Sequence, residues 1–268
     1  MSTETVDNPL VTRDGALDAD AAEVVTIDQA TGSELARYPV AGAEEAQAAV
    51  IAARAAAGPW WDLGFDARAK HIRAWRREIA AGGEEAAAII HAENGKPLED
   101  ARAEVLAVLE HLRFVLGNAS RVLGPRHVPS PPSETNQRAW IEHLPYGVVG
   151  VIGPWNFPLA TPGAIVIHAI AAGNAVVLKP SHITPGIGQW LVRAWQRAVP
   201  EHSAVLQDLI GYAATGQALI GAGVDKVAFT GSVRSGRAVA WAAGWPKRWA
   251  VSAAVWCMFK AWVQGPSV

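Results

Sequence analysis

The feature that most constrains this chain is an alternation of short apolar runs with helix-like stretches after residue 147. Four apolar runs occur, at residues 148–152, 175–178, 205–210 and 226–229. Between them lie three segments with helical patterns, at residues 162–172, 185–199 and 215–222. Strands that alternate with helices at this spacing are typical of βαβ units. The sequence therefore predicts an α/β fold over residues 147–240, with a parallel sheet and helices on both of its faces.

The residues before this region predict a different organisation. Residues 1–23 are acidic and predict a flexible tail, and residues 24–27 and 35–40 predict a strand pair joined by a turn. Four helices are then predicted, which together with the strand pair would form an N-terminal region, 24–136, packing on the sheet. The first helix is expected at residues 43–57, and the second begins after a cap at Asp66. The third is expected at residues 84–93 with an Asn94-Gly95 cap, and the fourth at about 98–117.

A proline-rich segment and an exposed strand are predicted to link the two regions. Residues 124–136 contain four prolines and predict a connection without regular structure. Residues 138–144 alternate loosely between polar and apolar, as an exposed strand does. We expect residues 137–146 to be an extended strand that could pair with a second copy in a homo-oligomer.

Composition excludes several classes of function. The chain has 268 residues, half of them hydrophobic, and a formal net charge of −2, so it can bury a core but has no electrostatic footprint for nucleic acid. Its single cysteine, Cys257, excludes an intrachain disulfide and a cysteine-rich metal site, and no metal site is expected. Low cysteine usage without a secretory signal favours a reducing compartment and a cytoplasmic location.

One apolar stretch raises the alternative of a membrane protein. Residues 157–178 lack Asp, Glu, Lys and Arg, and their length matches a span of about 20 residues. However, Pro158, Pro162, Gly163 and the Gly173-Asn174 pair interrupt the stretch. These residues favour a helix, a turn and a buried strand, and hence a protein without a membrane span.

The loops after the four predicted strands carry the residues with chemical interest. Ligands of parallel sheets bind at the carboxyl ends of the strands, and helix N-termini bind anions. Lys179, Ser181 and His182 together suit a phosphate or a ribose, and Gly211 allows close approach of the backbone. After residue 229, a glycine-bounded turn opens a helix. The residues singled out are Gly153, Pro154, Trp155 and Asn156; Lys179, Ser181 and His182; Gly211; and Gly231, Ser232 and Gly236.

The same loops carry a family resemblance, although the chain lacks the Gly-x-Gly-x-x-Gly fingerprint. Residues 147–158 read GVVGVIGPWNFP, 172–181 read AGNAVVLKPS, 224–232 read VDKVAFTGS, and 93–102 read ENGKPLEDAR. With these motifs, residues 24–240 resemble the N-terminal part of an aldehyde dehydrogenase. The resemblance implies a Rossmann-like dinucleotide-binding region over residues 147–240 and NAD or NADP as the cofactor.

The resemblance also implies roles for individual residues. Asn156 would donate a hydrogen bond to the oxyanion formed from the aldehyde, and Lys179 would contact the adenine ribose. The family often has a glutamate at the position of His182; without that carboxylate and with Lys179 nearby, NADP should be tolerated or even preferred. The alternative is that His182 is a neutral surface ring without influence on the choice of cofactor. The residues that would line the pyrophosphate and the nicotinamide ribose are Ile152, Gly153, Pro154 and Trp155. Phe229, Gly231 and Ser232 would hold the pyrophosphate at the start of the helix that follows the fourth strand.

The family's other catalytic groups are not found. The reaction oxidises an aldehyde to a carboxylic acid with a cysteine nucleophile and a glutamate base. The Glu-Leu-Gly-Gly-Lys segment that carries the base is absent, and Cys257 lacks the family's Gly-Gln-x-Cys context. We therefore expect an incomplete chain that lacks the catalytic domain and is inactive by itself. The sheet is also expected to lack its fifth strand, leaving the strand at 226–229 with an exposed edge.

The C-terminal tail and the assembly of the chain leave alternatives open. Residues 241–268 hold five of the 12 tryptophans and depart from the family pattern, which suggests a frameshift, an internal deletion or mis-splicing. Cys257 in this tail is expected to be an inert thiol. The alternative function is a non-catalytic nucleotide-binding or interaction subunit that pairs through residues 138–144. If the chain instead represents a family enzyme, the expected partner is a small-molecule aldehyde, the substrate of the intact family.

Overall fold

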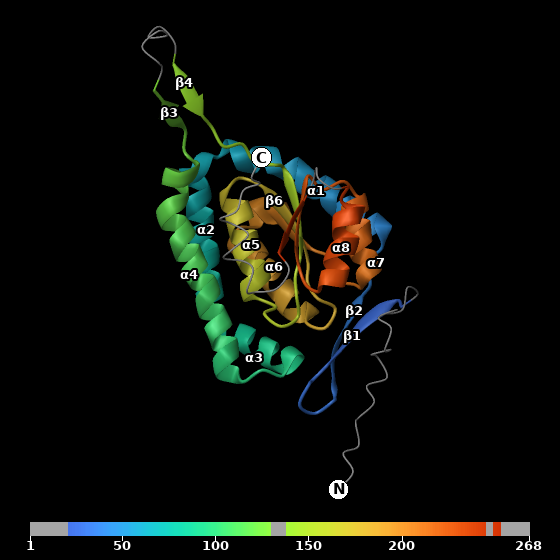
Figure 1. Ribbon diagram of the computed structural model, residues 1–268. Coiled ribbons are helices and arrows are strands. Elements are labelled where there is room, and N and C mark those ends of the chain that lie inside the picture. Colours follow the sequence, from blue (N-terminus) through green and yellow to red (C-terminus); the bar gives the residue numbers. More distant parts are fainter. Residues whose placement is uncertain (1–20, 130–137, 245–248, 253–268) are drawn as a thin grey trace.

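The computed structural model describes residues 21–129, 138–244 and 249–252. The tail predicted for residues 1–20, most of the proline-rich connection and Cys257 lie outside the described residues. The described chain is built around a parallel sheet, with helices on both of its faces and two small antiparallel strand pairs outside it (Figure 1). None of the described helices is long and apolar enough to cross a membrane.

Within the described residues, the sheet has five parallel strands in the order β7-β6-β5-β8-β9. Its central strand β5 occupies Val148–Ile152 and pairs with β6 on one side and with β8 on the other. This order arises because the chain moves outward from β5 to β6 and β7 and then crosses back to the other side of β5. The other strands are β6 (Ala175–Lys179), β7 (Leu206–Asp208), β8 (Lys226–Thr230) and β9 (Trp249–Ser252).

Both faces of the sheet are buried, which explains the continuous apolar runs of the strands. Val149 and Val151 point into one core, and Val148 and Ile152 point into the other. The first core contains α5 (Ala160–Ala171) and α6 (Pro185–Ala198), and the second contains α7 (Ala213–Gly221) and α8 (Val233–Ala242). All strands and connecting helices predicted after residue 147 are confirmed, with ends that shift by a few residues.

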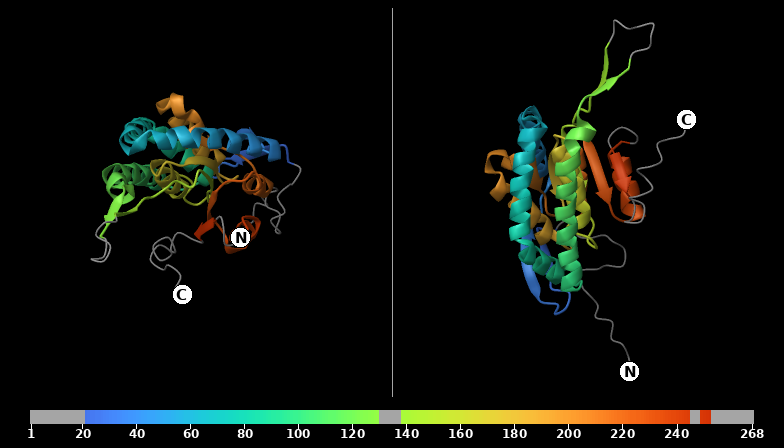
Figure 2. Two further views of the ribbon diagram at one scale, coloured as in Figure 1. Left: turned by 90° about the horizontal axis from the view of Figure 1, so that it is seen from above. Right: turned by 90° about the vertical axis from the view of Figure 1, so that its left-hand side faces the viewer.

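Four N-terminal helices extend the two cores. α1 (Ala43–Asp62) packs with α7 in the second core, and the other three cover α5 and α6 in the first. α2 and α4 run side by side along one edge of the molecule, as both Figure 1 and Figure 2 show. The left-handed Gly95, with φ of 77°, ends α3 as predicted. The three helices are α2 (Gly64–Ala81), α3 (Gly83–Asn94) and α4 (Leu98–Leu123).

Three predicted helix boundaries are wrong, because tertiary packing outweighs local signals. α1 continues past Pro59 to Asp62, since Trp60 is fully buried and its indole donates to the Ile170 carbonyl at 2.9 Å. α2 begins at Gly64, so Asp66 lies in its first turn rather than at its cap. α4 extends six residues beyond Gly117 to Leu123, where buried Ala119 remains in the core.

The strand pairs are only partly as predicted. β1 (Glu23–Ile27) and β2 (Glu34–Pro39) form the expected antiparallel pair. The prediction that residues 124–136 lack regular structure is wrong for the start of this segment. There, β3 (Arg126–Val128) pairs antiparallel with β4 (Ala139–Ile141). This β3–β4 hairpin projects away from the rest of the chain (Figures 1 and 2). A short strand satisfies its backbone groups most simply by pairing with a neighbour, which the residue pattern of 124–136 does not reveal.

The expectation of a missing fifth strand and an exposed edge is also wrong. α8 extends through Trp241 to Ala242, and a left-handed Gly244 follows it. β9 then pairs in parallel with β8, from Val227 opposite Trp249 to Thr230 opposite Ser252. The backbone donors and acceptors of β8 that would otherwise face water are thereby satisfied by the segment that was predicted to be an aberrant tail.

Candidate functional site

The candidate site lies where the order of the sheet reverses. The connections from β5 and from β8 run in opposite directions, because β5 leads to β6 while β8 leads to β9 on the other side. A crevice at the carboxyl ends of two such strands is the usual binding place for nucleotides in open α/β sheets. The loop after Ile152 and the turn after Thr230 are therefore the centre of the site.

The loop after β5 combines tight packing at its base with exposed side chains at its tip. The Gly153 N–H donates to the Lys179 carbonyl at 3.0 Å, and a Cβ on Gly153 would lie 3.2 Å from Pro162. Pro154 is buried, whereas Trp155 is 53% exposed and Asn156 is exposed. The side-chain amide of Asn156 is thus held at a strand end and remains accessible.

Residues of the α3–α4 connection hold the backbone of this loop, which the sequence analysis did not foresee. The Asn94 amide donates to the Trp155 carbonyl at 2.6 Å, and the Lys96 ammonium donates to the Asn156 carbonyl at 2.8 Å. The Lys96 ammonium also lies 4.6 Å from the centre of the Phe157 ring. Asn94 and Lys96 belong to the motif ENGKPLEDAR, which the sequence analysis had singled out. That they bind the carbonyls of Trp155 and Asn156 is apparent only from the fold.

A buried carboxylate completes this support. Glu104, 3% exposed, is ion-paired with Lys96. Its second oxygen accepts hydrogen bonds from the N–H groups of Leu159 and Ala160, at 3.1 and 3.0 Å. These N–H groups belong to the start of α5, where a negative charge is stabilised by the helix dipole. Lys96 and Glu104 therefore connect the N-terminal helices α3 and α4 to the segment that contains Asn156, Lys96 at Asn156 itself and Glu104 at the start of α5.

Lys179 is a buried cation at the end of β6. Its side chain lies on the α7 side, where Gly216 leaves room for it: a Cβ there would lie 3.6 Å from the Lys179 Cδ. The ammonium donates to the Pro180 carbonyl at 3.2 Å and has no carboxylate partner within the described residues. Burial lowers the pKa of Lys179 to about 8, because the charged form loses its hydration.

His182 lies close to this ammonium but does not carry a charge at neutral pH. Burial, and secondarily the positive charge of Lys179, lowers the pKa of His182 to about 4. Its ring lies 5.2 Å from that of Tyr212. Ser181 is engaged locally, since its hydroxyl accepts from the Ile183 N–H at 3.2 Å. At neutral pH this loop therefore presents one cation, Lys179, beside a neutral imidazole.

The turn after β8 leads into a helix N-terminus. Ser232 caps α8, and its hydroxyl accepts from the Ser235 N–H at 3.1 Å. A side chain at Gly231 would require its neighbours to shift, since a Cβ there would lie 2.6 Å from the Phe229 ring. The hydroxyl of Thr230 is buried without a hydrogen-bond partner in the described part of the chain. The remaining N–H groups of the first turn of α8 are suited to an anion.

Two of the predicted residues lie in the fold in a way that packing alone explains. The side chain of Thr215 packs against Gly211, and a Cβ on Gly211 would lie only 2.0 Å from the Thr215 hydroxyl. Gly236 is buried one turn into α8, and its N–H donates to the Ser232 carbonyl at 2.8 Å. The predictions that these glycines approach the cofactor remain untested.

The residues at the switch point fit a dinucleotide. A pyrophosphate needs N–H donors at a helix start, which α8 offers, and a ribose needs polar groups, which Lys179 and His182 offer. The Lys179 ammonium, which donates only to the Pro180 carbonyl among the described residues, and the Thr230 hydroxyl, which has no hydrogen-bond partner among them, are buried polar groups that such a ligand could satisfy. In contrast, the described residues contain no cluster of His, Cys, Asp and Glu that could hold a metal ion.

The strand order defines a Rossmann-like α/β fold, and the groups at its switch point form a candidate nucleotide site. Comparison with protein families makes this more specific: residues 17–252 match the model of the aldehyde dehydrogenase family, and the chain belongs to that family. The match extends on both sides beyond the expected 24–240 and includes β9.

Individual relatives agree with this assignment. The chain is 37% identical over 220 residues to an N-succinylglutamate 5-semialdehyde dehydrogenase of Novosphingobium aromaticivorans, a match that covers 81% of this chain and 45% of the relative. It resembles the structure of an NAD-dependent aldehyde dehydrogenase from Sinorhizobium meliloti, with 32% identity, a TM-score of 0.80, and coverage of 88% and 47%. An NADP-dependent enzyme of E. coli is similar, with 28% identity, a TM-score of 0.80, and coverage of 86% and 48%.

The chain thus spans about half the length of the relatives that it matches. Family members use NAD or NADP, and the two solved structures named above represent one of each kind. Cys257 and the residues around it lie outside the described part of the chain.

Proposed function

We propose that this chain binds NAD or NADP at the carboxyl ends of β5, β6 and β8, as the nucleotide-binding part of an aldehyde dehydrogenase. The observation that carries the proposal is the buried Lys179 ammonium, which lacks a carboxylate partner within the described residues. Isolated charges are rarely buried without a partner, because the cost of desolvation is several kcal/mol. A ribose of the cofactor would supply the missing acceptors.

The other site residues have complementary roles in this proposal. Ile152, Gly153, Pro154 and Trp155 would line the pyrophosphate and nicotinamide ribose, while Phe229, Gly231 and Ser232 would place the α8 N-terminus against the pyrophosphate. When bound, the nicotinamide would accept a hydride from the substrate. The exposed amide of Asn156 would donate a hydrogen bond to the oxyanion of an aldehyde under attack.

Cofactor selection would depend on the loop after β6. His182 is neutral at pH 7 because its pKa is lowered to about 4, so it would neither attract nor repel a 2′-phosphate. Lys179, with a pKa of about 8, remains mostly charged. We infer that NADP is tolerated alongside NAD. Without a cysteine and a glutamate in the family's sequence contexts, the chain alone would bind the dinucleotide but would not oxidise an aldehyde.

The test is isothermal titration of the purified chain with NAD and with NADP. We expect binding of both, and Lys179→Met should weaken it at least tenfold, since the buried ammonium is lost. Lys70→Met is the matched control, because Lys70 is an exposed residue of α2 outside the site. A folded wild-type chain that binds neither nucleotide would contradict the proposal.

A second candidate function, as an interaction subunit, is favoured by the β3–β4 hairpin. It exposes Trp140 to 59% and Ile141 to 39%, and the Trp140 ring lies 5.1 Å from that of His127. Exposed aromatic and aliphatic side chains on a projecting hairpin are typical of a pairing surface. Light scattering during gel filtration tests this function: we expect a dimer that Trp140→Ser dissociates, whereas a monomeric wild-type chain would exclude homo-oligomerisation.

A further inference from the structure

A groove between α2 and α4 has no part in the nucleotide site. It has a volume of about 400 Å³ and is lined by Leu116 and four arginines, Arg73, Arg76, Arg77 and Arg113. Among the residues that the structure describes, no Asp or Glu lines the groove, although the chain as a whole has a net charge of −2. Arg113 lies nine residues beyond Glu104 on α4, about 14 Å farther along the helix. The groove is therefore a separate, strongly basic feature.

The arginines of α2 repel one another and lack compensation. Arg73 stands three residues before Arg76 and four before Arg77, so each of these two is its neighbour on the helix surface, where like charges are unfavourable. Arg113 is ion-paired with Glu110, but Arg73, Arg76 and Arg77 have no carboxylate partner within residues 21–129, 138–244 and 249–252. Nearby Glu78 is already paired with Arg197 of α6. An anion in the groove would relieve this repulsion.

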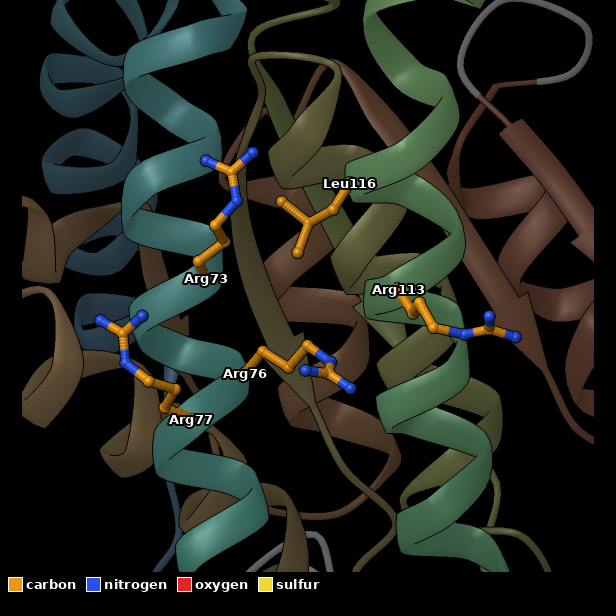
Figure 3. A pocket seen from close by; sticks show the side chains of 5 residues that line it. All are labelled: Arg73, Arg76, Arg77, Arg113 and Leu116. Atoms are coloured by element: carbon orange, nitrogen blue, oxygen red, sulfur yellow. The ribbon is translucent and has the colours of Figure 1, made fainter.

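Figure 3 shows which side chains point into the groove. Arg73 and Arg76 extend from α2 into the space between the helices, and Leu116 points toward them from α4, whereas Arg77 and Arg113 point away. The Arg76 Nε is buried and has no hydrogen-bond partner among the described residues. A buried donor of this kind is unfavourable unless it meets an acceptor. Two guanidinium groups and one apolar wall therefore define the part of the groove that could hold a ligand.

We propose that the α2–α4 groove is a binding site for a small phosphate ester. Arg73 and Arg76 would bind the phosphoryl group, because guanidinium groups donate two parallel hydrogen bonds to phosphate oxygens. Leu116, which is half-buried, would contact the organic part of the ligand. The volume of the groove lies within the range of small-molecule sites. The site would act independently of the dinucleotide.

Inorganic phosphate and glycerol 3-phosphate are the probes for this site. Both would be titrated into the purified chain by calorimetry at constant ionic strength, with chloride as the reference anion. We expect both to bind, and tighter binding of the ester would identify an ester as the natural ligand, whereas equal binding would indicate free phosphate. The proposal would be overturned if neither inorganic phosphate nor glycerol 3-phosphate bound to the chain.

Variants assign the binding to the groove rather than to the α8 N-terminus. The double variant Arg73→Gln, Arg76→Gln should lower phosphate affinity at least tenfold, and Arg76→Lys should retain part of it. Lys70→Gln, which removes an exposed positive charge from the same helix outside the groove, should leave the affinity unchanged. Circular dichroism verifies folding. If the double variant binds phosphate as the wild type does, or if Lys70→Gln weakens it equally, the groove is not the site.

Discussion

The Lys96 ammonium donates a hydrogen bond to the backbone carbonyl of Asn156 at 2.8 Å, although 60 residues separate them in the chain. Lys96 is in turn ion-paired with Glu104, which binds the N–H groups at the start of α5. The proposed oxyanion donor is therefore positioned by the N-terminal helical layer and not only by its own loop. Changes in that layer should consequently affect both stability and nucleotide binding.

Removal of Lys96 should destabilise the chain strongly. Both partners of the Lys96–Glu104 pair are largely buried, with exposed fractions of 12% and 3%. Lys96→Met leaves the Glu104 carboxylate without its cation, and we expect the free energy of unfolding to fall by about 3 kcal/mol. Urea denaturation measures this loss.

Two further variants test the cause. Adding Glu104→Gln to Lys96→Met should restore part of the stability, because the remaining amide is neutral and its oxygen can still accept from α5. Arg102→Gln, which breaks exposed ion pairs with Glu84 and Glu99, should cost less than about 1 kcal/mol. Equal losses for Lys96→Met and Arg102→Gln would contradict the role of the buried pair.

Glu93 should make stability decrease with rising pH. Its carboxylate accepts from the N–H groups of Gly186 and Ile187 at the start of α6, at 2.8 and 3.1 Å. Burial nevertheless raises the pKa of Glu93 from 4.5 to about 7. Between these values the folded state holds a proton that the unfolded state releases, so the stabilising contribution of Glu93 is complete below pH 4.5 and is lost as pH rises through about 7.

Comparison of Glu93→Gln with the wild type isolates this effect. The variant cannot titrate, so its free energy of unfolding should decrease less than that of the wild type between pH 4.5 and 8. Glu44→Gln, at an exposed glutamate in the first turn of α1, should keep the wild-type slope. Urea denaturation at a series of pH values measures all three slopes, and parallel curves for Glu93→Gln and wild type would refute the prediction.

Dinucleotide affinity should fall at alkaline pH. Lys179 has a pKa of about 8, so its ammonium is mostly charged at pH 7 and mostly neutral at pH 9.5. We expect NADP affinity to be several-fold lower at pH 9.5 than at pH 7, with a smaller change in Lys179→Met. Calorimetry in buffers of different ionisation enthalpy separates proton release from binding, and a pH-independent wild-type affinity would count against a role for this ammonium.

Gly231 should not tolerate even a methyl group. An alanine Cβ would lie 2.6 Å from the Phe229 ring at the start of the turn before α8. Gly231→Ala should therefore cost about 1–3 kcal/mol through overpacking and should weaken nucleotide binding. Gly221→Ala is the matched control, because none of the described residues has an atom within 4 Å of a Cβ at that end of α7. Thermal unfolding should distinguish the two; a Gly231→Ala chain as stable as the control would contradict the close packing.

Several parts of the fold and site followed from the sequence because they depend on local signals. Continuous apolar runs such as Val148–Ile152 predicted buried parallel strands, and the Asn94-Gly95 pair predicted the end of α3. Lys179 and Ser232 could be placed at strand ends, since a parallel sheet brings the carboxyl ends of its strands to one edge. These inferences needed only the pattern of neighbouring residues and general rules of sheet topology.

Other features were decided by contacts between residues far apart in the chain. The burial of Trp60 extended α1 past Pro59, β9 paired with the edge of β8, and Lys96 and Glu104 met the loop around Asn156. Burial also lowered the pKa of Lys179 and His182, although neither residue type indicates this by itself. The sequence by itself determined the order of strands and helices from β5 to α8 and the polar residues at the ends of these strands. Only the tertiary structure decided which of these residues are buried, paired or charged, because those properties depend on neighbours brought together by folding.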